Sequence, residues 1–532
     1  MNTAAESAKP RTFAWARLFI LLFVAAVLGF LAATVTSDFS ITGRPTLELS
    51  AIVLFANFFV FAFVCTFPAW SWRRRVSLIL VGFLIQATLL CCFKMEGLYG
   101  NGRPKIVSRW NQGLLSHEFS EVALEPAQIQ FDPSKDAVWS GFRGRDRSGT
   151  LSNIAINSFQ SHPPEIVWER NVGSAWSSFA IADSVCITQE QRAEYESVVC
   201  YDLKTGEQLW EHGNAIKFGE SVAGYGPRAT PTIDGELVFC FGASGILDCL
   251  EVATGELVWS RDVLKENGIK NRNFGMTGSP LVELQRVIVS PGGEGKALIC
   301  YSRADGEEVW SSGSHNASYS SPHLAEICAV RSVICLNGDA VVAHRFSDGK
   351  PLFQIPWTNN DDEKNNVCQP VVWKVGNDGL TRIFISSSYG RGSAVFEISV
   401  HEGDDWQVSK IWHNKNLKSK FSSVVVHEQY VYGLDHGILT CLSLETGERM
   451  WKAGRYGHGQ FIRLGDKLII QSEKGFVAQV ECNPEGFKEL NRFDALSDRT
   501  WNHPASDGNY LLVRNDRKAI CYSIETKSQQ LD

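Results

Sequence analysis

A short repeated segment constrains the fold of this chain more than any other feature. Each copy has a strand-like stretch, a turn with Thr-Gly or Asp-Gly, and a second stretch that ends in tryptophan. The gapless copies are residues 200–210, 249–259, 300–310 and 441–451. Apolar residues alternate on both sides of the turn, where glycine tolerates a positive φ. Another strand-like stretch and, in several units, a Ser/Thr-Pro pair precede the copy, so each unit supplies the four strands of a propeller blade.

The aromatic residue that ends each copy allows the blades to be counted. Weaker copies also end in an aromatic residue, and a separate strand-like stretch lies ahead of the first complete copy. The end marks are Trp168, Trp210, Trp259, Trp310, Phe353, Trp412, Trp451 and Phe493. A half copy at 520–527 lacks its last strand, so we expect the stretch with Trp168 to complete it and close a ring of eight blades. Seven blades remain the alternative if the copy ending at Trp412 is misread.

The blade sequence resembles the PQQ-repeat (pyrroloquinoline-quinone) propellers, whose blades carry a Thr-Gly-Glu turn shortly before a tryptophan. The resemblance covers about residues 139–526. Its similarity to bacterial PQQ-binding-like repeat proteins is carried by the segments 139–149 (WSGFRGRDRSG), 188–192 (TQEQR), 226–231 (GPRATP), 454–460 (GRYGHGQ) and 500–505 (TWNHPA). It implies an all-β, eight-bladed propeller, but it says little about chemistry because one propeller fold supports catalysts and scaffolds alike.

Three apolar stretches predict transmembrane helices ahead of the propeller. They lie at about 13–35, 48–68 and 76–93, and a hydrocarbon core about 30 Å thick needs roughly 20 helical residues. Lys9 and Arg11 mark the amino terminus as cytoplasmic, and the basic residues 73–75 mark the second loop as cytoplasmic too. A cleaved signal peptide is the alternative interpretation of the first stretch.

These stretches divide the chain into four predicted parts. They are a cytoplasmic tail (1–12), a membrane domain with three transmembrane helices (13–93), a linker (94–137) and the propeller (138–532). The linker shows no sustained periodicity and is expected to hold at most a short helix. Three spans place the propeller outside the cytoplasm, so we expect a multi-pass protein of the cytoplasmic (inner) membrane with an extracytoplasmic or periplasmic propeller.

Propeller geometry predicts which face carries a ligand site. The starts of the inner strands share one face with the loops between second and third strands, opposite the Thr-Gly-Glu turns. The candidate residues on this face are Gln189, Glu190, Arg192, Arg228, Lys420, Arg455, His458, Asn502, His503, Arg514 and Asp516. Arg228, Lys420 and Arg455 suit a carboxylate or another anion, and His458 or His503 suits proton transfer. The alternative is that all of them form salt bridges and polar caps between blades.

The resemblance also raises the question of a cofactor. Quinoprotein dehydrogenases of this fold imply PQQ, a calcium ion, a catalytic Asp and a disulfide between adjacent cysteines. The only adjacent pair here is Cys91-Cys92, in the third predicted span, and no Cys-x-x-Cys-His haem motif is present. The second relative is the propeller subunit of the outer-membrane protein assembly machinery, which binds partner proteins and uses no cofactor. We therefore expect no cofactor, with PQQ and calcium as the alternative.

Net charge and the positions of the cysteines bear on nucleic-acid binding, disulfide bridges and structural zinc. A net charge of −7 without a Lys/Arg stripe beyond the membrane flank argues against nucleic acid. Cysteines recur at one position of the repeat, which favours small buried side chains, although Cys240–Cys249 and Cys186–Cys200 bridges are conceivable. No zinc-type spacing is present. The leading hypothesis is a binding or scaffolding module for a protein or small anionic ligand; the alternative is a quinoprotein-like oxidoreductase acting on an alcohol or sugar.

Overall fold

The computed structural model describes residues 91–108, 110, 129–361, 364–376 and 380–526, except 130 and 136, together with scattered positions between 71 and 88. The chain divides into two compact units, residues 1–113 and 114–532. The predicted spans at 13–35 and 48–68 lie outside the described residues, and the span at 76–93 lies within them only in part. Over the part of the chain that is described, no helix has the length and apolar character needed to cross a membrane.

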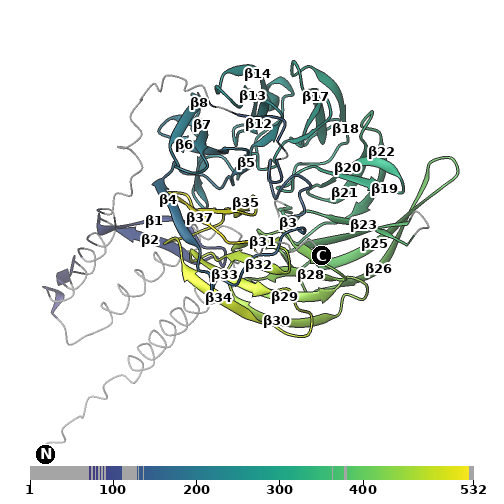
Figure 1. The fold of residues 1–532 in the computed structure, drawn as a ribbon. Coiled ribbons are helices and arrows are strands. Elements are labelled where there is room, and N and C mark those ends of the chain that lie inside the picture. Colours follow the sequence, from purple (N-terminus) through teal and green to yellow (C-terminus); the bar gives the residue numbers. More distant parts are fainter. Residues whose placement is uncertain are drawn as a thin grey trace, which may run out of the picture. The chain divides into compact units, whose positions relative to one another are not determined.

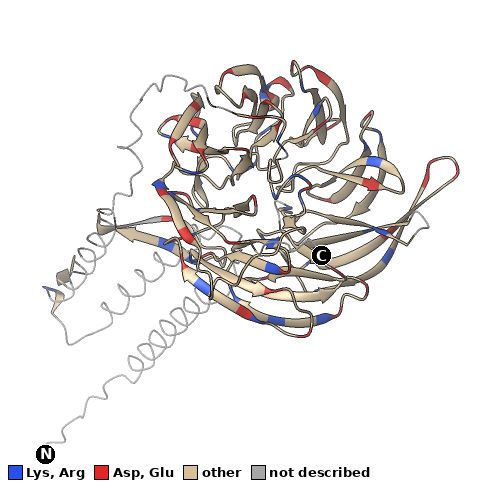
Figure 2. Cartoon of the chain, viewed as in Figure 1, with Lys and Arg blue, Asp and Glu red and all other residues tan. Residues whose placement is uncertain are grey.

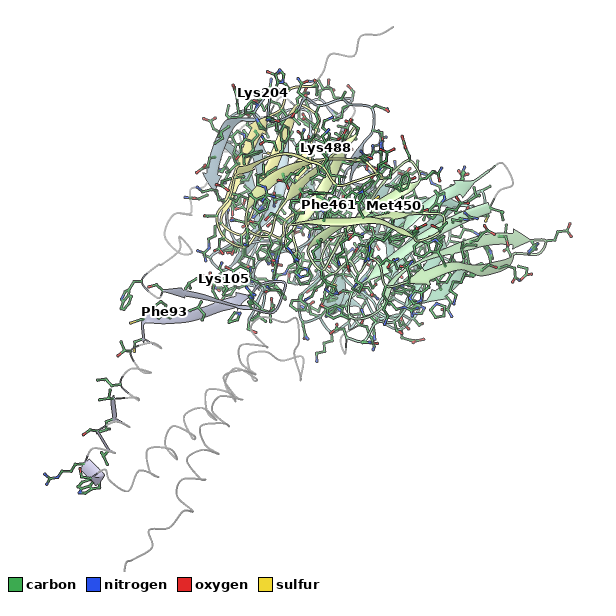
Figure 3. All side chains as sticks on the ribbon, turned by 90° about the horizontal axis from the view of Figure 1, so that it is seen from below. Phe93, Lys105, Lys204, Met450, Phe461 and Lys488 are labelled. Atoms are coloured by element: carbon green, nitrogen blue, oxygen red, sulfur yellow. The ribbon has the colours of Figure 1, made fainter. Side chains whose placement is uncertain are left out.

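A β-hairpin occupies the described end of the first unit. Strand β1 (Phe93–Leu98) pairs antiparallel with β2 (Pro104–Ser108), and the buried Lys105 forms an ion pair with Glu96 at 2.9 Å (Figure 3 labels Phe93 and Lys105). This hairpin was not predicted within the linker. It forms because the turn at 100–102, Gly-Asn-Gly, brings the two short stretches into register.

The second unit is a propeller of eight blades, and each blade is a four-stranded antiparallel sheet with its first strand innermost (Figure 1). Blade one consists of β5 (Ala180–Ala182), β6 (Val185–Arg192), β7 (Tyr195–Asp202) and β8 (Gln208–Asn214). Blade two consists of β11 (Thr232–Asp234), β12 (Leu237–Phe241), β13 (Ile246–Glu251) and β14 (Leu257–Asp262). Blade three consists of β15 (Leu281–Glu283), β16 (Arg286–Val289), β17 (Leu298–Ser302) and β18 (Glu308–Ser312). Blade four consists of β19 (His323–Ile327), β20 (Val330–Leu336), β21 (Ala340–Arg345) and β22 (Pro351–Pro356).

The other four blades continue the ring. Blade five consists of β23 (Val371–Val375), β24 (Leu380–Ser387), β25 (Gly392–His401) and β26 (Asp405–Asn414). Blade six consists of β27 (Val425–His427), β28 (Tyr430–Asp435), β29 (Ile438–Ser443) and β30 (Arg449–Arg455). Blade seven consists of β31 (Gln460–Leu464), β32 (Lys467–Gln471), β33 (Phe476–Glu481) and β34 (Glu489–Asp494), and blade eight of β35 (Ala505–Ser506), β36 (Tyr510–Arg514), β37 (Lys518–Ser523) and β4 (Glu165–Asn171). The hairpin β9 (Gly219–Glu220)–β10 (Gly224–Tyr225) and helix α4 (Val263–Glu266) lie in loops between blades.

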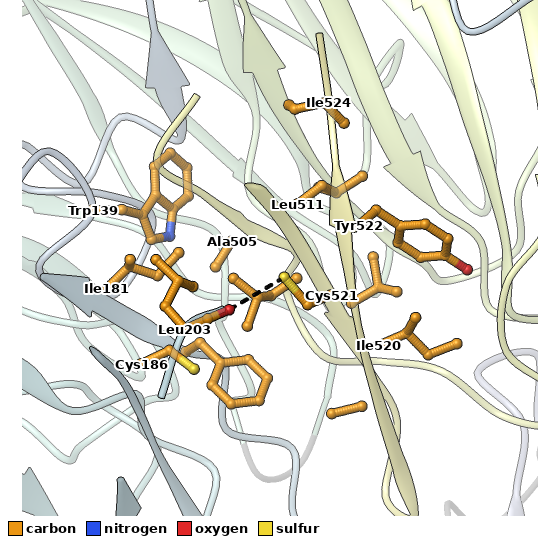
Figure 4. Close-up of a cluster of buried hydrophobic side chains, with 14 of the residues drawn as sticks. Trp139, Ile181, Cys186, Leu203, Ala505, Leu511, Ile520, Cys521, Tyr522 and Ile524 are labelled. Carbon is orange, nitrogen blue, oxygen red and sulfur yellow. Dashed lines mark hydrogen bonds between the residues drawn. The ribbon is translucent and has the colours of Figure 1, made fainter. Parts of the chain in front are cut away.

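The two ends of the propeller sequence meet in blade eight. Strand β4 pairs antiparallel with β37, and Trp168 lies directly opposite Cys521. Figure 4 shows Cys521 beside Leu203 and Cys186 of blade one, in one core with Trp139 and other side chains from both ends of the ring. This confirms that an early strand completes the last blade, and it confirms eight blades over seven.

All eight aromatic end marks lie on outermost strands, where they pack against the next blade. In five blades the indole N–H donates to a backbone carbonyl of the following blade at 2.8–3.0 Å. The glycine of the next blade's turn lies beneath the ring: a Cβ at Gly255 would come within 2.6 Å of Trp210. The repeated Thr-Gly and Trp are therefore two halves of one contact between neighbouring blades.

This contact predicts a large difference between two glycines with similar backbone angles. Gly255 has a φ of 73° and lies under Trp210, whereas Gly268 has a φ of 63° with open space around it. Gly255→Ala is expected to lower the free energy of unfolding by about 2–4 kcal/mol, because the left-handed strain and the clash add. Gly268→Ala adds only the strain, about 1 kcal/mol. Chemical denaturation of both variants tests this, and equal losses would contradict the proposed contact.

The repeat cysteines lie opposite the tryptophans, not opposite one another. Cys200 pairs with Trp210 and Cys249 with Trp259, and these cysteines are fully buried with free thiols. The conceivable bridges are not formed, because the register places Cys200 opposite Ile187 and Cys249 opposite Phe239. One residue of offset directs the two thiols of each candidate pair to opposite faces of the sheet.

A segment ahead of the first blade fills the central channel. Trp139 bridges to Ile181 of blade one, and Ser140 accepts a hydrogen bond from the backbone of Ile233 in blade two at 2.7 Å. At its far end β3 (Thr150–Leu151) pairs in parallel with β31 of blade seven. Inner strands surround the axis of a propeller, so a segment that binds several of them lies inside the ring. We call residues 139–151 the plug.

Two buried arginines of the plug bind blades on other sides of the channel. Arg147 donates to the carbonyls of Ser279 at 3.0 Å and Pro322 at 2.7 Å, and also to that of Pro280. Arg143 donates to the carbonyl of Val424 in blade six at 2.5 Å. The plug thus connects blades one, two, three, four, six and seven, and the WSGFRGRDRSG motif has a structural role.

Candidate functional site

A belt of hydroxyl and amide side chains surrounds the channel where the inner strands begin. The backbone N–H of Ser178 donates to Thr230 Oγ1 at 3.2 Å, Thr230 to Ser279 Oγ at 2.9 Å, and Ser279 to Ser321 Oγ at 2.9 Å. Gln369 continues the belt by donating to Ser423 Oγ at 3.1 Å. These bonds link blades one, two, three and four in sequence and blade five to blade six.

The residue two positions before each belt residue is equivalent in all eight blades. These residues precede the inner strands on one face, so they surround the open end of the channel. We call the set the mouth ring: Trp176, Arg228, Thr277, Tyr319, Val367, Phe421, His458 and Trp501. Seven of them are partly exposed, whereas the residues that follow them are buried. His458 is the buried exception, and the side chain of Arg228 is only 7% exposed.

Four consecutive ring positions form a continuous aromatic arc. Phe421 contacts His458 at 5.4 Å and Trp501 at 5.1 Å between ring centroids, and Trp501 contacts Trp176 at 5.0 Å. The Trp501 indole N–H donates to Glu473 Oε1 at 2.9 Å and the Trp176 indole N–H to the Ala223 carbonyl at 2.9 Å, so both rings are fixed. Partly exposed aromatic rings in a fixed arrangement are typical of ligand sites.

Cations of the protein already occupy several aromatic faces at the mouth. The Arg499 guanidinium lies 4.9 Å from the Trp176 ring and 4.4 Å from the Trp501 ring, and it also donates to the carbonyls of Val222 and Ala223. Lys420 Nζ lies 5.2 Å from the Phe421 ring and 5.6 Å from Tyr389. The rings of Trp176, Trp501 and Phe421 thus already bind cationic side chains of the protein itself.

The structure brings some of the predicted site residues to the mouth. Arg228 and His458 belong to the mouth ring, and Lys420 precedes Phe421, which His458 also contacts. Arg228 instead lies against its own loop, near Phe218 and Glu220. Burial lowers the pKa of Arg228 to about 10, against the opposing effect of Glu220.

Other predicted residues lie just beneath the ring and connect blades. Gln189 donates to the Ala229 carbonyl at 2.7 Å, and Asn502 donates to the Ser177 carbonyl at 2.7 Å. The carbonyl of His503 accepts from Ser178 Oγ at 2.7 Å, and its ring packs edge-on against Phe142 of the plug at 5.0 Å. Burial lowers the pKa of His503 well below its ordinary value. For Gln189 and Asn502 the alternative of polar caps between blades agrees with these bonds.

Glu190, Arg192 and Arg514 form a buried network where blades eight and one meet. Arg192 Nε lies 2.9 Å from Glu190 Oε2, and Arg514 donates to Thr188 Oγ1 at 2.7 Å and to the Gly173 carbonyl at 3.0 Å. Burial raises the pKa of Glu190, but Arg192 and Arg514 outweigh it and lower the pKa below its usual value. This network joins the two blades that close the ring. Asp516, two residues beyond Arg514, lies 3.9 Å from Arg517 Nε.

Arg455 lies away from the mouth ring. It ends the outermost strand of blade six and is exposed beside a surface hollow of about 450 Å³ whose lining includes Arg449 and Lys452. The sequence assigned it to the mouth because it closely precedes the inner strand of blade seven. In the fold, the connection from the outer to the inner strand crosses the blade within residues 456–459.

Sequence reasoning missed the aromatic members of the site. Trp176, Phe421 and Trp501 were not selected, because only charged and hydrogen-bonding side chains were considered. An offset of two residues before a Ser/Thr-Pro pair identifies Tyr319, which precedes Ser321-Pro322. It does not identify the three missed residues, because Ser178-Phe179, Ser423-Val424 and His503-Pro504 stand at the corresponding positions. In Figure 2, positions of both signs of charge are scattered over the blades, and no continuous run of basic positions is seen in this view.

A histidine in the channel predicts a pH dependence of stability. Burial lowers the pKa of His323 to about 4, and Arg147 adds to the shift while Asp146 opposes it. Because the unfolded chain binds a proton near pH 6.5, its contribution to stability is complete above pH 6.5 and decreases by about 1 kcal/mol per pH unit towards pH 4. We expect His323→Gln to flatten the decrease in melting temperature over this range. The exposed His401→Gln is the control; a matching change there would contradict the assignment.

The residues at the mouth fit a quinone cofactor only in part. Trp176 and Trp501 are flat and partly exposed, although Arg499 already lies against both rings and Arg228 donates to the carbonyls of Gly224 and Gly226 in its own loop. Among the described residues, however, no cluster of three or more His, Cys, Asp and Glu could hold a metal ion, and the described propeller contains no adjacent cysteine pair. We therefore derive no step through the cofactor.

Comparisons with known proteins agree on the architecture. A family model described as "Outer membrane protein assembly factor BamB" matches residues 152–453.

BamB from Moraxella catarrhalis is 15% identical, with a TM-score of 0.49 over 68% of this chain and 99% of that one. Quinohemoprotein alcohol dehydrogenase from Comamonas testosteroni is 12% identical, with a TM-score of 0.55 over 74% of this chain and 81% of its own. The dehydrogenase ADHIIG from Pseudomonas putida HK5 is 10% identical, with a TM-score of 0.53 over 75% and 84%. No curated protein sequence matches. At these identities the two dehydrogenase structures, whose TM-scores exceed 0.5, establish the fold alone.

Proposed function

The chain belongs to the PQQ-repeat β-propeller family, the one whose model is described as the assembly factor BamB, and from that premise we propose that it is a binding module whose ligand site is the mouth ring. The aromatic arc carries this proposal. Phe421, Trp501 and Trp176 are held in place by hydrogen bonds and stacking, yet remain partly exposed. Exposed aromatic groups that the fold holds in one arrangement favour binding because little conformational freedom is lost.

The charges at the mouth support an uncharged or anionic ligand. Arg499 and Lys420 occupy aromatic faces that a cationic ligand would need, and they repel a further positive charge. Arg228 adds a third positive group, although Glu220 partly compensates it. A protein that presents an acidic or apolar side chain, or a small anionic compound, satisfies these conditions.

We further propose that the module is held at the outer surface of the cytoplasmic membrane. The apolar stretches at 13–35, 48–68 and 76–93 and the basic residues at 73–75 support this location. Among the described helical residues that precede the hairpin, Leu80 and Leu84 are 62% and 67% exposed, as lipid-facing side chains are when no membrane surrounds them. Protease protection of the amino terminus in oriented membrane vesicles tests the topology.

Site-directed photo-crosslinking tests the mouth as the ligand site. A benzoylphenylalanine that replaces Phe421 in the full chain should capture the ligand in native membranes. The matched control replaces Phe487, a partly buried phenylalanine in the turn between the third and fourth strands of blade seven, on the opposite face. An adduct at Phe421 alone supports the proposal, whereas equal adducts at both positions, or none at Phe421, refute it.

The alternative function is a quinoprotein-like oxidoreductase. The likeness of the fold to two quinohemoprotein alcohol dehydrogenases favours it. The full chain would then take up PQQ with calcium in a 1:1 ratio, detectable by absorbance. Such uptake, lost in Trp501→Ala, would overturn the non-catalytic binding function.

A further inference from the structure

Blade six differs from the other seven blades in the pairing of its two outer strands. In every blade one β-bulge interrupts this pairing shortly before the aromatic end mark. Blade six has a second bulge, in which Gly454 is the extra residue between the paired Ala453 and Arg455. Gly454 has a φ of 72°, and a Cβ there would come within 2.7 Å of the Tyr456 ring. The second bulge is thus specific to blade six and depends on glycine.

The two bulges of blade six direct three cationic side chains to one face of the sheet. Arg449, Lys452 and Arg455 are three positions apart, so in a regular strand Lys452 would lie on the opposite face from the other two. With the bulges, the three residues pair with every second residue of β29 between 438 and 442. Alternate residues of a strand share a face, so the three cations form a row with steps of about 7 Å.

Two of these cations have no partner in the described part of the chain. Arg449 and Arg455 line the surface hollow of about 450 Å³ on blade six, and both are exposed. Neither side chain forms an ion pair or a hydrogen bond with a described residue. Arg492 on the outermost strand of blade seven is also exposed, but two of its nitrogens donate to Glu489. The hollow therefore presents two guanidinium groups whose donors no described group of the protein uses.

The third cation of the row adds to the positive charge of the hollow. The buried carboxylate of Asp435 binds both Lys452 and Lys418, so this group of three keeps one net positive charge. A ligand must therefore bring several negative charges. A phosphate group carries about 1.5 to 2 negative charges at neutral pH, and guanidinium binds its oxygens in pairs. We propose that this hollow binds a ligand with at least two phosphate groups, at a site separate from the mouth ring.

Calorimetry on the full chain in detergent tests this ligand. The probes are tripolyphosphate, which carries three phosphate groups, and citrate, which carries three carboxylates. Tripolyphosphate is expected to bind in a 1:1 ratio and more tightly than citrate. Arg449→Gln and Arg455→Gln are each expected to weaken its binding about three- to tenfold, because each removes a paired donor to a phosphate. Arg492→Gln removes the same charge from an exposed position outside the hollow, so this control should leave the affinity unchanged.

The proposal is overturned if tripolyphosphate does not bind, if citrate binds equally well, or if Arg492→Gln weakens binding as much as Arg455→Gln. None of these results bears on the mouth ring, which the crosslinker at Phe421 tests. Lipid added to the detergent then distinguishes a lipid headgroup from a soluble phosphate compound. If cardiolipin, with two phosphates, competes with tripolyphosphate more than phosphatidylglycerol does at equal lipid phosphate, the ligand is a headgroup. If the two lipids have the same effect, the ligand is a soluble compound.

Discussion

Trp168→Ala is expected to lower the free energy of unfolding of the propeller by about 4 kcal/mol. The side chain is 7% exposed, and its indole N–H donates to the Leu203 carbonyl at 2.9 Å. Its ring covers Gly206, so removal leaves a cavity between blades eight and one. These are the blades that close the ring. We therefore expect hydrogen exchange, followed by mass spectrometry, to accelerate first in β4 and β37.

The control for this variant lies on the same strand. Ile166 is 58% exposed, so Ile166→Ala changes the composition of β4 without opening a cavity. Its free energy of unfolding is expected to stay within about 0.5 kcal/mol of the parent protein. If both variants are equally stable, or if exchange accelerates uniformly over all blades, the closing role of β4 is refuted.

Arg147→Met is expected to cost about 3–5 kcal/mol, because carbonyls from two blades lose a shared charged donor. Arg147 is 5% exposed, and it donates to Ser279, Pro280 and Pro322. Methionine fills a similar volume and cannot donate, so the buried carbonyls remain unsatisfied. Chemical denaturation followed by circular dichroism measures the loss.

Arg145 in the same plug provides the comparison, because it is exposed. Arg145→Met removes the same charge at the surface and should change the free energy of unfolding by less than about 0.5 kcal/mol. Equal effects of the two substitutions would show that the plug stabilises the ring through net charge and not through the hydrogen bonds of Arg147.

Part of the mouth was predictable and part was not. Arg228, Lys420 and His458 could be assigned to the correct face, because the direction of each strand follows from the repeat. Arg455 could not, because the sequence does not show how far from the axis a residue at the end of an outer strand lies. Glu190 and Arg514 looked like ligand groups, yet they bind across the junction of blades eight and one. A buried network and an open site use the same residue types, and only packing distinguishes them.

The sequence by itself determined the architecture, because the propeller repeats the same local pattern of strands and turns eight times. Thr-Gly turns, alternating strands and a terminal tryptophan recur at constant spacing, and an orphan strand at one end matches a missing strand at the other. Only the tertiary structure decided what fills the channel and what surrounds its mouth. The plug binds six blades through contacts between residues more than a hundred positions apart, such as Arg143 and Val424. No local pattern encodes such contacts, because they depend on how the closed ring brings distant loops to one axis.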